Sequence, residues 1–259
     1  MRTLFILALL VPAFTLAKES QITCYHTQIC NIVHYLAPKV SLEVLELPKE
    51  TDPHHYEISA KELKTLVKAK HLITPNRALV PWIERALVSR KTEDSLELGL
   101  PKMNGQSDGP LAHFWLYKKG LCEAIDSIRN KLQSWQIPIE NKNCSDLKIE
   151  ELSKAQKRLL VVTHDALYPL ASELGLEIVA ARTSHHSHEV SAQTLKEIAL
   201  KTKSRKSLWI VENQIKIPPT VLSYVKSDDK KVNLNTTGEL YETPGQTLKS
   251  LLKEIFSDN

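Results

Sequence analysis

The sequence predicts an α/β protein of two lobes, each with a parallel sheet flanked by helices. Short apolar runs rich in β-branched residues alternate with amphipathic segments of helical period, a pattern that favours parallel sheets. The alternation occurs twice, before and after a middle segment (residues 117–157) whose pattern is mostly helical. The roughly 240 residues that follow an apolar N-terminal segment are enough to build two such lobes with their own cores.

The first half predicts a strand, a helix, a strand and a helix, in that order, over residues 40–47, 60–70, 71–74 and 79–87. The start of the first helix is marked by Ser59 and Glu62, which have the spacing of a capping box. The second half predicts strands over residues 158–163, 177–180, 207–211 and 231–234. Helices are predicted between and after these strands, over residues 166–174, 191–201, 218–225 and 247–256.

The N-terminal residues 1–17 read as a secretory signal peptide cleaved after about Ala17, which predicts export to the periplasm. A retained N-terminal anchor is the alternative, and no later stretch approaches the ~20 apolar residues of a membrane span. The predicted domains are an N-terminal lobe, a helical linker and a C-terminal lobe, over residues 18–116, 117–157 and 158–259.

Composition excludes some classes of function. The formal net charge is +4, and basic and acidic residues are interspersed rather than clustered as in a nucleic-acid binder. With seven glycines and neither a GxGxxG nor a Walker loop, the chain does not resemble a nucleotide-binding protein.

Four cysteines would meet an oxidising compartment after export. They allow three pairings, among which the sequence cannot choose; the local one, Cys24 with Cys30 and Cys122 with Cys144, is slightly favoured. A cysteine zinc site is disfavoured because no CxxC spacing occurs.

Three histidines stand near the ends of predicted elements. His54 lies in a loop stiffened by Pro53, His164 directly follows a predicted strand, and His113 precedes an aromatic pair and a helix. In open α/β sheets ligands bind at the carboxyl ends of strands, so the three imidazoles can converge on one crevice and bind zinc. For any one of them alone, a hydrogen-bonded or exposed side chain is the simpler interpretation.

Several stretches resemble a known family in family order, and two of them, DPHHYE (residues 52–57) and THDA (163–166), are the most specific. The others are 76–82, 112–116, 210–214 and 234–238. The chain resembles the periplasmic zinc- and manganese-binding receptors of bacterial ABC transporters, the zinc-uptake type in particular. The resemblance implies a metal clamped between two lobes, and His54, His113 and His164 as its ligands. Histidine at position 164, where manganese receptors tend to have glutamate, favours Zn²⁺ over Mn²⁺ as the transported ligand. The implied partners are a membrane permease and its ATPase, and we expect a monomer without enzymatic activity.

The chain departs from the family at the fourth ligand. Asn235 stands where the family usually has an aspartate, so the site is expected to be three histidines with water or a weak amide contact, and to bind metal less tightly. The connecting helix is expected to be shortened at Pro138, and the histidine-rich loop of some zinc receptors is missing.

Further residues are candidates for supporting roles. His185, His186 and His188 form a tract that is either an auxiliary capture site or a solvated loop. His55, Asp165 and Glu212 are candidates for contacts that orient the ligands, although each has a plain structural interpretation.

Three alternatives remain open at this level. One is a manganese receptor of the same fold. The second is a zinc hydrolase, because three histidines and a water also form a catalytic site, although HExxH is absent. The third is a periplasmic zinc buffer or adhesin without a transporter.

Overall fold

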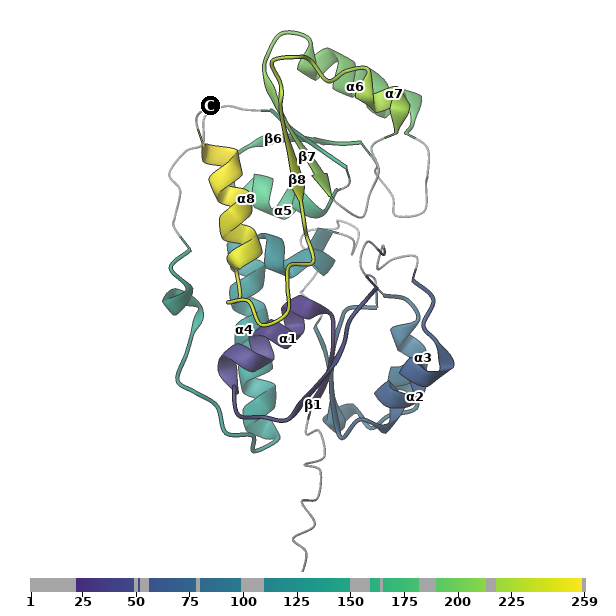
Figure 1. The fold of residues 1–259 in the computed structure, drawn as a ribbon, viewed down its shortest axis with the longest axis vertical. Helices are drawn as coiled ribbons and strands as arrows, with labels where there is room; N and C mark the ends of the chain where they lie inside the picture. The colour runs from purple at the N-terminus through teal and green to yellow at the C-terminus, as the bar shows by residue number, and fades with distance from the viewer. Residues whose placement is uncertain are drawn as a thin grey trace, which may run out of the picture.

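The structure is a computed structural model. It describes residues 22–48, 51, 56–77, 80–98, 110–149, 159–163, 165–181, 190–212 and 218–257. Two parallel sheets of four strands, each flanked by helices, confirm the predicted fold class (Figure 1). No described helix is long and apolar enough to cross a membrane.

The first sheet has the strand order β2-β1-β3-β4. Its strands are β1 (Ile22–Tyr25), β2 (Leu42–Leu45), β3 (His71–Pro75) and β4 (Ser95–Leu98). The helical segments are α1 (Thr27–Leu36), α2 (Ala60–Lys68), α3 (Ile83–Val88) and the short 3₁₀ helix η1 (Thr92–Asp94). Every residue of β1 is buried, as expected for a central strand covered on both faces.

The second sheet repeats the same topology, in the order β6-β5-β7-β8. Its strands are β5 (Leu159–Val162), β6 (Glu177–Ala180), β7 (Ser207–Glu212) and β8 (Lys230–Leu234). The helical segments are η4 (Asp165–Leu167), α5 (Tyr168–Leu174), α6 (Ala192–Thr202), α7 (Pro219–Leu222) and α8 (Gln246–Phe256). In both sheets the first strand has its next two strands on opposite sides, the arrangement that leaves a ligand crevice at the carboxyl ends.

Between the sheets the chain forms η2 (Pro110–Leu116), α4 (Lys118–Ser134) and η3 (Cys144–Leu147). The expected mostly helical linker is therefore helical over α4 and η3, with a non-helical stretch between them that contains Pro138. One continuous apolar core includes residues of both sheets, of α4 and of α8, for example Ile22, Ile125, Leu160 and Leu251. The two lobes thus share a core, and α4 and α8 run along the same side of the lobes in Figure 1.

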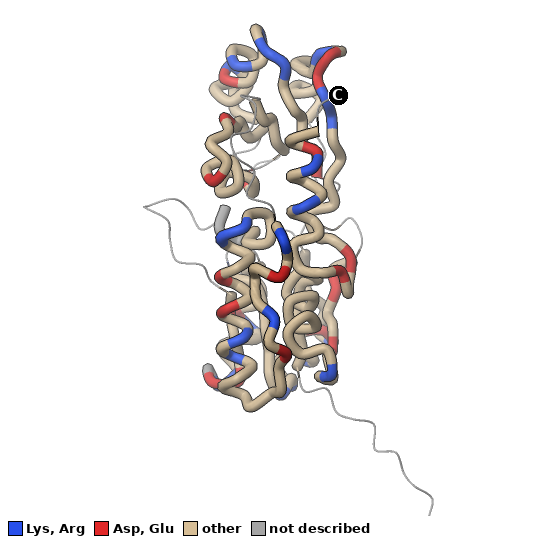
Figure 2. The backbone as a smooth tube through the Cα atoms, turned by 90° about the vertical axis from the view of Figure 1, so that its left-hand side faces the viewer, with Lys and Arg blue, Asp and Glu red and all other residues tan. Residues whose placement is uncertain are grey.

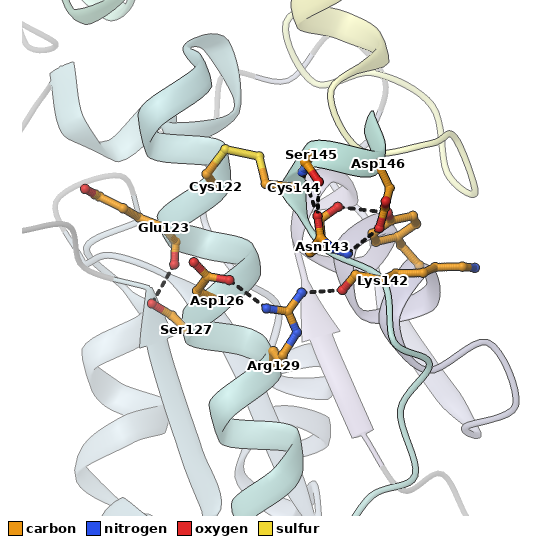
Figure 3. Close-up of polar contacts among 11 residues, drawn as sticks. Cys122, Glu123, Asp126, Ser127, Arg129, Lys142, Asn143, Cys144, Ser145 and Asp146 are labelled. Carbon is orange, nitrogen blue, oxygen red and sulfur yellow. Dashed lines mark hydrogen bonds and ion pairs between the residues drawn. A yellow bond between two sulfur atoms is a disulfide. The ribbon is translucent and has the colours of Figure 1, made fainter. Parts of the chain in front are cut away.

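Two disulfides confirm the favoured pairing. Cys24 bonds to Cys30 and ties β1 to α1, and Cys122 bonds to Cys144 and ties α4 to η3. Figure 3 shows the polar contacts beside the second disulfide: Arg129 of α4 binds Asp126 and the carbonyl oxygen of Lys142. The non-helical segment between α4 and η3 is thereby attached to α4 through Lys142, and η3 through the disulfide.

Charged residues are distributed over the whole molecule. Lys, Arg, Asp and Glu alternate along the elements in the view of Figure 2. Most of the ion pairs among the described residues involve partly exposed side chains, such as Lys201 with Glu197 and Arg205 with Glu177. This distribution agrees with the mixed surface that the composition predicts.

Candidate metal centre

His113 is buried at the junction of the two lobes. It lies in η2, where its φ of −99° and ψ of 49° interrupt the helical path, and 5% of its surface is exposed. The element η2 packs against η4, which begins at Asp165. The chain segment that follows position 164 is therefore in contact with the segment that carries His113.

Trp115 connects His113 with two other elements. Its indole ring lies edge-on to the His113 imidazole at a centroid distance of 5.4 Å, and 4.3 Å from the ring of His26. The indole Nε1 donates a hydrogen bond of 2.6 Å to the carbonyl oxygen of Thr236. The position next to Asn235 is thus fixed to the same buried ring that His113 contacts.

Tyr56, the first described residue of the DPHHYE stretch, lies near the carboxyl end of β1. Tyr56 donates a hydrogen bond of 2.7 Å to Glu62 and lies edge-on to Trp82 at 6.4 Å. Trp82 in turn contacts Tyr25, the last residue of β1, at 4.7 Å. Since His26 follows Tyr25, Tyr56 lies near the same strand end as Trp115.

Asn235 directly follows β8 and is exposed. Its Oδ1 accepts hydrogen bonds from the Thr237 amide, at 3.2 Å, and from the Thr237 hydroxyl, at 2.8 Å. An amide oxygen has two lone pairs, and both are used within this turn. The Asn235 carboxamide therefore closes its own turn.

A buried carboxylate contacts Thr163, the last described residue before position 164. Glu212, at the end of β7, is 4% exposed and accepts a hydrogen bond of 3.2 Å from the hydroxyl of Thr163. The Glu212 amide donates to the same hydroxyl oxygen at 3.4 Å. Because β5 and β7 are adjacent parallel strands, Glu212 and Thr163 both lie at the carboxyl end of the second sheet.

The other candidates fall outside the described residues. They are His54, His55, His164, His185, His186 and His188. Within the described part of the chain, no group of three His, Cys, Asp or Glu side chains is close enough to hold a metal. The ligand set therefore stays a prediction, and the structure describes only the surroundings of His113, Asn235, Asp165 and Glu212.

His26 is a buried histidine that the sequence analysis did not select. It is 2% exposed and caps α1, accepting the Gln28 amide hydrogen on Nδ1 at 3.3 Å. Its Nε2 has no hydrogen-bond partner, and burial lowers the pKa of His26 to about 3. The signal was available, because a polar residue directly after an apolar strand and before a helix also marked the other candidates.

No family model and no curated protein sequence matches the chain. Solved structures do match: a Zn(II)-bound variant of AdcAII from Streptococcus pneumoniae has a TM-score of 0.71 at 21% identity, covering 91% of this chain and 98% of that one. The periplasmic zinc-binding protein TroA from Treponema pallidum has a TM-score of 0.66 at 15% identity, with 90% and 95% covered. ZnuA has a TM-score of 0.68 at 16% identity, with 90% and 96% covered.

This chain has their two-lobe fold. The likeness extends over nearly the full length of each chain, so the shared fold includes both sheets and the segment between them. The fold that the sequence resemblance implied is confirmed. At these identities the likeness does not extend to the metal or to the ligands.

Proposed function

We propose that this protein is a periplasmic receptor that binds Zn²⁺ between its lobes and delivers it to the permease of an ABC transporter. The main support is the position of His113, buried in η2 between the two sheets and in contact with Trp115. Of the elements that flank the other candidate ligand positions, η4 and α8 pack against η2, and β2 pairs with β1. The two zinc-bound or zinc-binding neighbours of the same fold add to this support.

The proposed ligands are His54, His113 and His164, with Asn235 or water at the fourth position. Three neutral imidazoles suit Zn²⁺, whereas Mn²⁺ prefers carboxylates. Glu212 would then lie outside the ligand set and orient the site through Thr163, the residue before His164. Binding and release of the ion break no covalent bond, so the proposed function is not enzymatic.

Calorimetric titration of the metal-free mature protein tests this proposal. We expect one tight Zn²⁺ equivalent and little Mn²⁺ binding. His54→Ala and His164→Ala should each lower the zinc affinity by at least about a hundredfold. A residue that only orients a ligand lowers metal affinity by about a hundredfold at most when it is replaced.

His71→Asn is the matched control, because His71 stands at the amino end of β3, away from the proposed site, and stacks on Trp135. It should bind zinc like the wild type. Preferred binding of Mn²⁺, or zinc binding that survives both ligand substitutions, would contradict the proposed site and direct attention to His185, His186 and His188.

A further inference from the structure

Two buried amide side chains lie on one face of α1. Gln28 and Asn31 are 3% and 1% exposed, among apolar neighbours such as Ile29 and Ile32. Residues three apart on a helix point the same way. Because a buried amide is destabilising unless it is hydrogen-bonded, the partners of these two side chains indicate what this face holds.

Their partners outside α1 lie in the loop between β8 and α8 and in the first turn of α8. Asn31 donates from Nδ2 to the Glu239 carbonyl at 2.8 Å and accepts the Tyr241 amide on Oδ1 at 2.6 Å. Gln28 donates from Nε2 to the Thr237 carbonyl at 2.8 Å and lies 3.2 Å from the Thr247 hydroxyl. We call Gln28 and Asn31 together with residues 237–241 the clasp. Figure 1 shows this loop descending from β8 to α1.

The loop path fits only a glycine at its centre. Gly238 has a φ of +68°, and a Cβ there would lie 2.2 Å from Gln28 Nε2. Close approach of the loop to α1 thus depends on a residue without a side chain. Together with the bond from Trp115 to Thr236, the clasp attaches the whole stretch after Asn235 to the first lobe and to η2.

We propose that Gln28 and Asn31 are positioning residues that hold the loop of Asn235, and with it the fourth corner of the metal site, against the first lobe. This inference rests on the proposed function. The clasp joins the second lobe to the first beside the site, so the lobes cannot separate there while its part-buried hydrogen bonds remain. Release of zinc through this side therefore requires the clasp to open, and the strength of the clasp sets the release rate.

The test compares Asn31→Leu, which removes both hydrogen bonds at similar volume, with Tyr35→Phe. Tyr35 is also on α1, but its hydroxyl donates to the Asn143 carbonyl at 3.1 Å, outside the clasp. Zinc dissociation into excess chelator should be about tenfold faster in Asn31→Leu, as expected when one or two hydrogen bonds are lost, and within twofold of wild type in Tyr35→Phe. Gln28→Met should act like Asn31→Leu. It provides a second test if Asn31→Leu does not fold.

Amide hydrogen exchange of residues 236–241 in the metal-free proteins is the second readout. It should be faster in Asn31→Leu and unchanged in Tyr35→Phe. If Asn31→Leu showed faster exchange but released zinc at the wild-type rate, the clasp would be merely structural and the proposal would be overturned. Unchanged exchange in Asn31→Leu would also overturn it. A wild-type protein that binds no zinc would refute the proposed function instead, and the exchange data would still show whether the clasp holds the loop.

Discussion

At the scale of single residues, the least expected feature is a neutral histidine in the core. His26 caps α1 through Nδ1, which places the ring proton on Nε2. Burial lowers its pKa to about 3. Between pH about 6.5 and 3, this ring therefore stays neutral in the folded protein while it becomes protonated in the unfolded chain. Its ring lies against Trp115, which also contacts His113, the one candidate histidine ligand that the structure describes.

This shift predicts a pH dependence of stability. Below pH about 6.5 the unfolded state binds a proton at His26 that the folded state does not, so the free energy of unfolding falls as the pH falls toward 3. The expected slope from this group is about 1.4 kcal/mol per pH unit. His26→Asn keeps an acceptor for the Gln28 amide and should lose that slope. Urea unfolding of both metal-free proteins at pH 7.5, 6 and 5 measures it, and equal slopes would contradict the role of His26.

Part of the candidate site could be predicted from single residues of the sequence. The sequence selected His113 as a histidine before an aromatic pair and a helix, and the structure places this residue, buried, in η2. His26 follows β1 and precedes α1, a comparable position, and was not selected. The bond from Trp115 to Thr236 joins residues 121 positions apart, and spacing along the chain carries no information on such a contact.

At the scale of elements, local pattern predicted most of the fold. The capping box at Ser59 and Glu62 is present, and the strand over residues 177–180 has the predicted bounds. The edge strand β4 was not predicted, because its four residues, SLEL, are too short and too polar for a clear strand signal. Two predicted helices are shorter than expected: α3 begins after a turn at Pro81 and Trp82, and α7 spans only Pro219–Leu222.

The disulfide between α4 and η3 gives a prediction for the stability of the protein. The bond between Cys122 and Cys144 closes a loop of 22 residues, and its loss should cost about 3 kcal/mol through the entropy of the unfolded chain. The double variant Cys122→Ala/Cys144→Ala should unfold at a correspondingly lower urea concentration. Its other disulfide, between Cys24 and Cys30, should stay intact in thiol alkylation. A cost below about 1 kcal/mol would mean that the Arg129 contacts and the shared core already hold the segment.

At the scale of the whole molecule, the two lobes meet along one core and are tied by the clasp. The sequence pattern predicted two lobes, but long-range polar contacts such as Asn31 with Glu239 and Tyr241 required the structure. Charge also matters at this scale. Three neutral imidazoles and the amide of Asn235 would leave the +2 charge of zinc uncompensated, and Glu212 is the only carboxylate that is buried among the residues the structure describes.

The most direct test of the central claim is a zinc-edge anomalous difference map from crystals of the mature protein grown with one equivalent of Zn²⁺. The account predicts a single strong peak between the lobes, about 2.0–2.1 Å from imidazole nitrogens of His54, His113 and His164. A main peak on His185, His186 and His188, or a peak between the lobes without His113 as a ligand, would contradict it.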